Sequence, residues 1–518
     1  MRKFPVYLIF VPVMVWLVAC QSMAPTTAVD NATEVVIGTG GAADGAFSVP
    51  DLVPLDVAWD DRSPFRSGLV AGEQAALDGL AGASVYHIDF EIADDLAHLK
   101  GRQRVRYTNQ EATPLSEVYF RLFPNLLGGL AEIQAVRVND QDVTPTFELG
   151  NSAMRVPLSP ALQPEGQAVI QIDFSVRVPT ESEGHYGVFV FEDDVLALAH
   201  FYPMIAVYDD EGWNLEIPPD FGDVVYADSS FYLVRVTAPA ALTIVASGVE
   251  VEREVAGEWQ QVALAGGPMR DFYLVASTRY TVLSDQVGET TVNSYVLPEF
   301  LNEAKITLGY AVEALQIFNE RFGPYPFAEF DVASTPTLAL GIEYPGIIAI
   351  ALRLYDPAQR GDYPLVYLES TVAHEVGHQW FYSVVGSDQL DEPWLDEALT
   401  QYATLLYFQD LYGASGAEGF RQSLRERWGR VDKADIPIGL PVRAYSGVEY
   451  GAIVYGRGPL FVETLAKTMG GETFGSFVRD YCEVHRWGIA TTESLKQLAE
   501  SHCDCDLTPL FVDWVYER

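Results

Sequence analysis

The sequence predicts an α+β protein with several domains, in which an all-β N-terminal domain is followed by a mainly helical domain. Two observations predict this order. Apolar and polar residues alternate in short runs from residue 84 to about residue 247, as they do in half-buried strands. Near residue 297 the apolar spacing changes to that of helices. At 518 residues the chain is also too long for one typical core.

Seven alternating runs define the β-rich N-terminal domain, which we place at residues 84–290. Turn-forming residues separate the runs, and no long helical pattern interrupts them. The runs are Val85–Ile92, Gly101–Tyr107, Ala131–Val138, Ala168–Val178, Val188–Phe191, Ser230–Thr237 and Ala241–Ser247. Strands of this number and length indicate a domain of about two hundred residues.

The second domain is predicted at residues 291–518. Apolar residues from Pro298 to Phe322 recur at helical spacing, and the sequence Gly-Pro-Tyr-Pro that follows ends this helix. A strand-like stretch runs from Phe330 to Ala351. The remaining residues show a mainly helical pattern up to Arg518.

The first twenty residues have the pattern of a secretory signal. Arg2 and Lys3 precede an apolar run from Phe4 to Ala19, which is short for a membrane-spanning helix. The ending Leu-Val-Ala-Cys20 resembles the lipobox of bacterial lipoproteins, which implies that Cys20 carries lipid and begins the mature chain. An ordinary signal peptide or an uncleaved anchor is the alternative. We therefore expect an extracytoplasmic protein, lipid-anchored to the cell membrane or outer membrane, with residues 21–83 as a tether or linker.

The composition excludes some classes of partner. The chain has 72 acidic and 32 Lys or Arg residues, a net charge of −40, which disfavours binding to nucleic acid or to an anionic lipid surface. Besides Cys20 there are three cysteines, Cys482, Cys503 and Cys505. Because three is an odd number, at least one thiol stays free or pairs elsewhere, and the sequence assigns no disulfide.

A metal-binding pattern lies in the helical half of the chain. His374-Glu375-x-x-His378 places two imidazoles on one face of a helix, so that both can bind one zinc ion. Glu397 follows His378 after 18 residues, which is room to end one helix and enter a second. These three residues are the predicted zinc ligands, and Glu375 lies close enough to act on a zinc-bound water.

Two other interpretations of this pattern remain. The spacing can arise by chance on a solvated helix face, although an acidic residue in a second helical pattern makes that less plausible. The zinc can also be structural, but structural sites are normally closed by four Cys or His ligands. Two histidines, one glutamate and the additional carboxylate of Glu375 favour a catalytic role.

These residues resemble the gluzincin metallopeptidases, and the flanking sequences resemble the aminopeptidase N family. The matching segments are Ala373-His-Glu-Val-Gly-His-Gln-Trp-Phe381 and Trp394-Leu-Asp-Glu-Ala398. Gly341-Ile-Glu-Tyr-Pro345 partly matches that family's Gly-x-Met-Glu-Asn motif, with one residue fewer between Gly341 and Glu343 and without its Met and Asn. The resemblance implies a thermolysin-like catalytic domain with one zinc ion per chain. It also implies that Glu343 binds the substrate's α-amine and that the backbone at Gly341 lies along the substrate.

A third segment extends the resemblance. Val454-Tyr-Gly-Arg-Gly-Pro-Leu460 is similar to the family's Tyr-x-Lys-Gly segment, with Arg457 in place of Lys. This implies that Tyr455 donates a hydrogen bond to the oxyanion of the tetrahedral intermediate, with Tyr450 as the nearby rival. The resemblance covers residues 84–518, a short form without the family's C-terminal helical domain, which implies a more open cleft.

The resulting functional hypothesis is a zinc aminopeptidase that acts on peptides, with Glu375 as the general base. The altered motif at Gly341 leaves a zinc endopeptidase on the same scaffold as one alternative. A surface protein that binds without catalysis is the other, although such a protein needs neither Glu375 nor Tyr455. No feature of the sequence indicates a side-chain preference or an oligomeric state.

Overall fold

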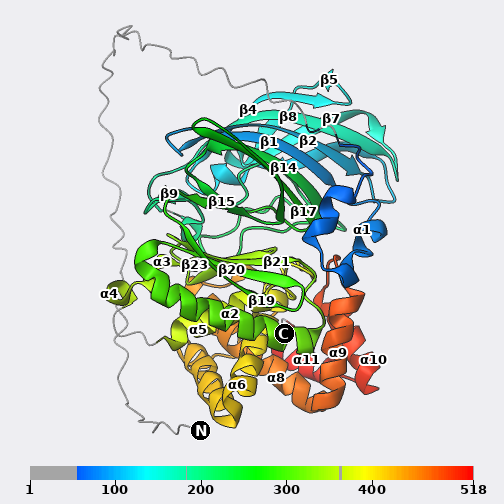
Figure 1. The fold of residues 1–518 in the computed structure, drawn as a ribbon. Coiled ribbons are helices and arrows are strands. Elements are labelled where there is room, and N and C mark those ends of the chain that lie inside the picture. Colours follow the sequence, from blue (N-terminus) through cyan, green and yellow to red (C-terminus); the bar gives the residue numbers. More distant parts are fainter. Residues whose placement is uncertain (1–54, 56, 183, 361–364, 517–518) are drawn as a thin grey trace, which may run out of the picture. The chain divides into compact units, whose positions relative to one another are not determined.

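The β-strands gather in one half of the molecule and the helices in the other (Figure 1). The computed structural model describes residues 55, 57–182, 184–360 and 365–516, and these belong to one compact unit. The many-stranded N-terminal region and the helical C-terminal region confirm the predicted fold class. The predicted signal, Cys20 and most of the predicted tether lie outside the described residues.

A sheet of eight strands forms the main part of the β region, in the order β16-β17-β14-β1-β2-β8-β4-β5. Neighbouring strands are antiparallel except for β1 and β14, which are parallel. The bounds are β1 Val85–Ile92, β2 His98–Thr108, β4 Leu130–Val138, β5 Gln141–Asp142, β8 Gln167–Arg177, β14 Ser230–Pro239, β16 Val249–Ala256 and β17 Trp259–Met269. Alternate side chains of β8 are buried, which is the alternation that its sequence predicts.

Three smaller sheets complete the β region, in the orders β15-β18-β10-β9, β11-β3-β7-β6 and β12-β13. Their strands are β3 Leu115–Arg121, β6 Thr146–Glu148, β7 Ala153–Leu162, β9 Phe189–Glu192, β10 Val195–Leu198, β11 Met204–Ile205, β12 Tyr208–Asp209, β13 Gly212–Trp213, β15 Thr243–Ala246 and β18 Leu274–Ser277. Each of the seven predicted runs overlaps an observed strand. A short helix, α1 (Ala76–Gly79), precedes the first strand.

A five-stranded mixed sheet begins the second half, in the order β19-β20-β21-β23-β22. Its strands are β19 Thr281–Val287, β20 Thr290–Val296, β21 Glu329–Thr335, β22 Gly341–Tyr344 and β23 Ile347–Ala351. The strands β20, β21 and β23 are parallel, and β22 is the antiparallel edge strand. The β19–β20 hairpin crosses the predicted division at residue 290, because β20 pairs with β21. That domain boundary stays a prediction.

Helix α2 (Leu301–Phe322) connects β20 to β21, and a 3₁₀ turn at Pro298–Phe300 precedes it. The helix confirms the predicted one, apart from this first turn. Its apolar face, which includes Ala311, Leu315 and Phe318, is fully buried. It ends at Gly323, whose φ of 109° is readily adopted only by glycine.

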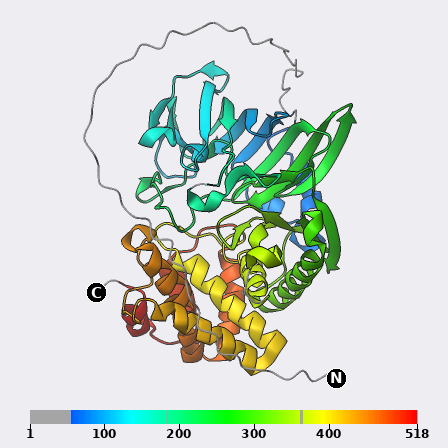
Figure 2. The ribbon, with the colours of Figure 1, turned by 90° about the vertical axis from the view of Figure 1, so that its left-hand side faces the viewer.

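Helices follow the sheet, as the sequence predicts, and Figure 2 shows them grouped on one side of the β region. They are α3 Leu352–Tyr355, α4 Pro357–Arg360, α5 Val366–Gly377, α6 Trp394–Gly429, α7 Gly447–Ala452, α8 Gly458–Met469, α9 Gly471–Val484, α10 Thr492–Cys503 and α11 Thr508–Trp514. Gly413, with φ 67° and ψ −158°, interrupts α6 and divides it into two segments. Among the described residues, no helix is long and apolar enough to cross a membrane.

The cysteines that the sequence left unassigned have definite states. Cys503 and Cys505 form a disulfide at the end of α10. Cys482 is buried in α9 as a free thiol.

Arg270 joins the β region to the helical half. It follows β17 directly and is only 1% exposed. Its guanidinium donates hydrogen bonds to the backbone oxygens of Tyr382 (2.6 Å), Val384 (3.3 Å) and Gly488. A Cβ atom at Gly386 would lie 2.1 Å from Cζ of Arg270, so the loop can close around the guanidinium only with glycine there. The buried guanidinium of Arg270 therefore supplies hydrogen-bond donors to three backbone carbonyls of the helical half.

We expect Arg270→Met to destabilise the protein by about 3 kcal/mol or more, because the carbonyls would stay buried without their donor. Thermal unfolding followed by circular dichroism measures this effect. Arg137→Met is the matched control, since Arg137 forms an exposed pair with Asp142, and such pairs contribute about 0–1 kcal/mol. Equal melting temperatures for the two variants would contradict the role given to Arg270.

Candidate metal and active site

Three potential ligand atoms meet between α5 and α6. Nε2 of His374 lies 3.2 Å from Nε2 of His378 and 3.1 Å from Oε2 of Glu397. The distance from Nε2 of His378 to Oε2 of Glu397 is 3.6 Å. All three side chains are buried. The structure thus brings together the three residues that the sequence predicts as zinc ligands.

Packing of the two helices fixes these positions. In α5 the apolar residues Leu368, Val372 and Val376 are buried, and the helix contacts α2, α6 and the edge of the mixed sheet. At the start of α6, Trp394 is fully buried and donates from its indole nitrogen to Thr492. Glu397 lies in the first turn of α6, where the helix dipole favours a negative charge.

The buried carboxylate of Asp396 orients His378. Nδ1 of His378 is hydrogen-bonded to Oδ1 of Asp396, while Gln389 donates to Oδ2 of the same carboxylate. With Nδ1 carrying the proton, the lone pair of Nε2 points toward His374 and Glu397. Although burial alone would lower the pKa of His378, the nearby carboxylates of Asp396 and Glu343 raise it well above its usual value. Asp396 adjoins the predicted ligand Glu397, but it was not among the predicted site residues.

The electrostatics of these side chains suit a divalent cation. Burial lowers the pKa of His374 to about 4, so its imidazole is neutral near pH 7 and can offer a lone pair. Burial would raise the pKa of Glu397, but its hydrogen bonds to both histidines hold that pKa below its usual value. Two imidazole nitrogens and a carboxylate oxygen converge on one point. This donor set is the one that Zn²⁺ prefers in open, three-ligand sites.

Glu375 lies beside this cluster with its carboxylate against β22. A Cβ atom at Gly341 would lie 2.5 Å from Oε1 of Glu375, so the strand approaches this closely only because residue 341 is glycine. Burial raises the pKa of Glu375 to about 8. Carboxylate oxygens of Glu375 and Glu343 share a small volume with a ring nitrogen of His378. Glu375 is therefore placed to exchange a proton with a water molecule at the metal position.

A second group of carboxylates forms around Glu343, which β22 places at the edge of the sheet. Glu343 is buried, and Gln389 bridges it to Asp396 by hydrogen bonds to both carboxylates. Asp223, from the loop before β14, has a carboxylate oxygen within 4.8 Å of Glu343 and Asp396. Burial raises the pKa of both Glu343 and Asp223, the charge of His378 lowers it, and the neighbouring carboxylates raise it further. A cationic group at this position would stabilise both ionised carboxylates.

Tyr455 belongs to a π-helical turn, Ile453–Arg457, between α7 and α8. Its hydroxyl donates a hydrogen bond to Oε1 of Glu397, the oxygen turned away from the histidines. The rival Tyr450 lies with its ring centroid 5.6 Å from that of Tyr455, and its hydroxyl has no partner among the described residues. Of the two tyrosines, only Tyr455 lines the cavity at the metal position.

All the predicted site residues line one cavity of about 940 Å³. These are Gly341, Glu343, His374, Glu375, His378, Glu397 and Tyr455. The cavity extends along both segments of α6, where Phe408, Phe420 and Arg427 line it. Its volume lies at the upper end of the range for ligand pockets, about 300–1,000 Å³.

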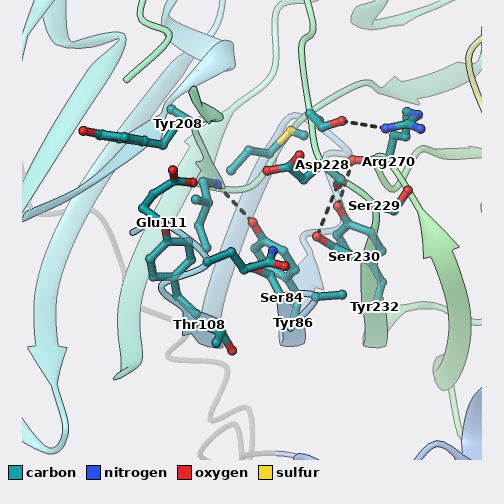
Figure 3. Close-up of a pocket in the computed structure, with 17 residues that line it drawn as sticks. Ser84, Tyr86, Thr108, Glu111, Tyr208, Asp228, Ser229, Ser230, Tyr232 and Arg270 are labelled. Atoms are coloured by element: carbon teal, nitrogen blue, oxygen red, sulfur yellow. Dashed lines mark hydrogen bonds between the residues drawn. The ribbon is translucent and has the colours of Figure 1, made fainter. Parts of the chain in front are cut away.

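A second pocket, in the β region, is much smaller at about 40 Å³ (Figure 3). The rings of Tyr86 and Tyr232 stack in it with their centroids 4.9 Å apart. The Tyr86 hydroxyl accepts a hydrogen bond from the Ile205 amide, and the Tyr232 hydroxyl donates to the carbonyl of Arg270. These polar groups serve packing, and the volume suits only water-sized ligands.

Four residues of the site were not predicted from the sequence: Asp223, Gln389, Asp396 and Arg427. Asp396 carried a usable signal, because a metal-bound histidine usually donates its second ring N–H to a carboxylate or a carbonyl. The other three lie in segments without a motif, and only the folded chain brings them to the cavity.

Two histidines and a glutamate on successive helices beside a mixed sheet define a gluzincin type of metallopeptidase site. Residues 306–514 match the peptidase family M1 domain. Aminopeptidase M1-B of Oryza sativa subsp. japonica is 23% identical over 373 residues, which cover 68% of this chain and 41% of that protein. Aminopeptidase 2 of Candida albicans is 21% identical over 452 residues, covering 83% of this chain and 46% of that protein. The chain therefore spans less than half the length of these relatives.

A solved structure shares the fold. A mutant of an M1 zinc metallopeptidase from Deinococcus radiodurans, bound to a Tyr-Ser-Ala substrate, aligns with a TM-score of 0.61 at 18% identity. The alignment covers 84% of this chain and 95% of that one. The solved structure shares the fold, and the domain match and the sequence relatives support an aminopeptidase N-like gluzincin family for the catalytic part of the chain.

We expect Asp396→Asn to lower zinc affinity by about 10- to 100-fold, because the variant loses the charge that orients His378. An asparagine amide would also set its NH₂ group against either the Gln389 donor or the N–H of His378. Competition with a fluorescent chelator measures the affinity. Asp410→Asn, an exposed residue of the same helix paired with Arg321, is the control. Equal affinities for both variants would rule out this role for Asp396.

Proposed function

We propose that the protein is a zinc aminopeptidase that hydrolyses the N-terminal peptide bond of peptides. One observation supports this most directly. A pair of carboxylates, the buried Glu343 and the partly buried Asp223, lies next to a metal-binding cluster and a spare carboxylate, Glu375. A carboxylate held beyond the metal position pairs with an N-terminal ammonium, and so selects the first peptide bond.

We propose one zinc ion per chain, held by His374, His378 and Glu397. When bound, zinc polarises the substrate carbonyl and lowers the pKa of a water molecule. Glu375 would accept a proton from the attacking water and deliver it to the leaving amine. The Tyr455 hydroxyl, which donates to Glu397 in this structure, turns to the carbonyl oxygen as negative charge develops there.

Glu343 and Asp223 bind the α-ammonium in this proposal, and the backbone at Gly341 lies along the first residue. Gly341 belongs to the edge strand β22, which pairs with β23 on one side only. Its free side can pair with an extended peptide as an added strand. Such pairing would carry the first peptide bond past Glu375 and the metal position.

The test compares leucine and alanine anilides with free and blocked amines. Wild type, Glu343→Ala, Asp223→Asn and Glu375→Ala are assayed, and the zinc content of each sample is measured. We expect hydrolysis of the free-amine forms only. Glu375→Ala should lose at least about 100-fold in kcat. Glu343→Ala should lose about 10- to 100-fold in kcat/KM, because one charged pair is removed.

Other outcomes distinguish the alternatives. Cleavage of blocked substrates that persists in Glu343→Ala would indicate an endopeptidase on the same scaffold. An absence of any cleavage by zinc-loaded wild type would indicate a surface binding protein. Either result would overturn the aminopeptidase proposal.

We further propose that the protein is exported and anchored to the bacterial cell envelope by lipid on Cys20. The charged start, the short apolar run and the Leu-Val-Ala-Cys20 ending support this. In a bacterial host, wild type should fractionate with membranes and incorporate labelled fatty acid, and Cys20→Ala should do neither. Ser22→Ala is the control. Unlabelled wild type in the soluble fraction would overturn the proposal.

A further inference from the structure

Two arginines, Arg427 and Arg430, line the cavity that holds the metal-binding cluster. Arg427 lies in the last turn of α6 and Arg430 is the residue that caps its C-terminus, so their side chains, three residues apart, share one face of the helix end. Arg427 is partly buried and Arg430 is exposed. Neither side chain forms an ion pair or a hydrogen bond with any other residue that the structure describes.

Acidic residues outnumber Lys and Arg in the chain by 72 to 32, yet no described acidic side chain pairs with either arginine. On the same segment, Arg421 pairs with Glu418 and Glu463, and Arg425 pairs with Glu418. Burial and the nearby charge of Arg430 lower the pKa of Arg427. Two neighbouring guanidinium groups without counterions can bind an anion such as a carboxylate.

Two carboxylates that line the cavity, those of Glu426 and Glu369, accept hydrogen bonds from residues other than Arg427 and Arg430. Glu426, beside Arg427, accepts a hydrogen bond from Gln422. Glu369 of α5 accepts hydrogen bonds from the hydroxyls of Tyr407 and Tyr412. The guanidinium groups of Arg427 and Arg430 are thus left for a ligand in the cavity.

The break in α6 brings Arg427 back toward the metal. The two segments fold against each other, so that the rings of Phe408 and Phe420 stack with centroids 5.2 Å apart. The π-helical turn that carries Tyr455 then packs on the second segment. A Cβ atom at Gly456 would lie 3.0 Å from Cβ of Arg427. The electrostatic influence of Arg427 reaches His374, Glu397 and Tyr455.

The cavity therefore has two walls of opposite charge. The wall formed by β22 and the loop before β14 carries Glu343 and Asp223. The wall formed by the C-terminal end of α6 and its cap residue carries Arg427 and Arg430. The metal ligands belong to the same cavity. A short peptide with a free amine and a free carboxylate carries the complementary charges at its two ends.

We infer that Arg427 and Arg430 bind the C-terminal carboxylate of short peptides whose N-terminus occupies the Glu343 subsite. This inference rests on the proposed aminopeptidase function and names its substrate class. Guanidinium groups recognise carboxylates by paired, charge-assisted hydrogen bonds. An acidic side chain near the C-terminus offers the same group, so the experiment separates these two sources.

The experiment compares Leu-Gly-Gly with its C-terminal amide, using zinc-loaded wild type. The readout is the ratio of kcat/KM for acid to amide, so each enzyme is its own reference. We expect wild type to prefer the free acid about tenfold or more, mainly through KM. In Arg427→Gln and in the double variant with Arg430→Gln the ratio should approach one. Arg425→Gln removes a paired arginine from the same helix and should keep the wild-type ratio.

A second substrate pair, Leu-Gly-Asp-amide and Leu-Gly-Asn-amide, tests the side-chain source. Preference for the aspartate peptide without preference for the free acid would overturn the C-terminal assignment. Equal rates for acid and amide with wild type would also overturn it, while leaving the proposed aminopeptidase intact if leucine anilide is cleaved. If wild type cleaves neither the peptides nor the anilide, both proposals fail.

Discussion

Buried negative charge beside two imidazoles is the constraint on which the rest of this structure depends. Glu343, Glu375, Asp396 and Glu397 are all buried, and Asp223 adds a further carboxylate from the β region. Removing an ionised carboxylate from water without a partner costs several kcal/mol of free energy. Because the chain has a net charge of −40, its other side chains supply little positive charge to offset this cost. A divalent cation is the compensating group that this arrangement of ligand atoms suits.

The hydrogen bonds around the site follow from that constraint. Gln389 donates to two carboxylates, and the Tyr455 hydroxyl donates to a third. Each donor occupies part of the hydrogen-bonding capacity of its carboxylate and fixes the orientation of that group. A metal ligand and a general base both need a fixed orientation. The close approach of β22 to Glu375 leaves no room for a side chain at residue 341.

The β region takes part in the site as well as in the stability of the fold. It supplies Asp223 to the acidic wall, and through Arg270 it fixes the loop that follows the metal-binding helix α5. The second segment of α6 closes the opposite side of the cavity. A long cavity with acidic and basic walls thus arises from three parts of the chain that are distant in sequence.

The sequence by itself determined the features that depend on local spacing. The alternating strands, the helix Leu301–Phe322 and the relation of His374 to His378 follow from the periods of strands and helices. Glu397 was also predictable, because it opens the next long helix after α5. Only the tertiary structure decided the positions of Asp223, Gln389 and Arg427, and it brings Tyr455 rather than its rival Tyr450 to the cavity. These depend on how a loop, a broken helix and a π-helical turn pack against distant elements, and no short-range pattern encodes such packing.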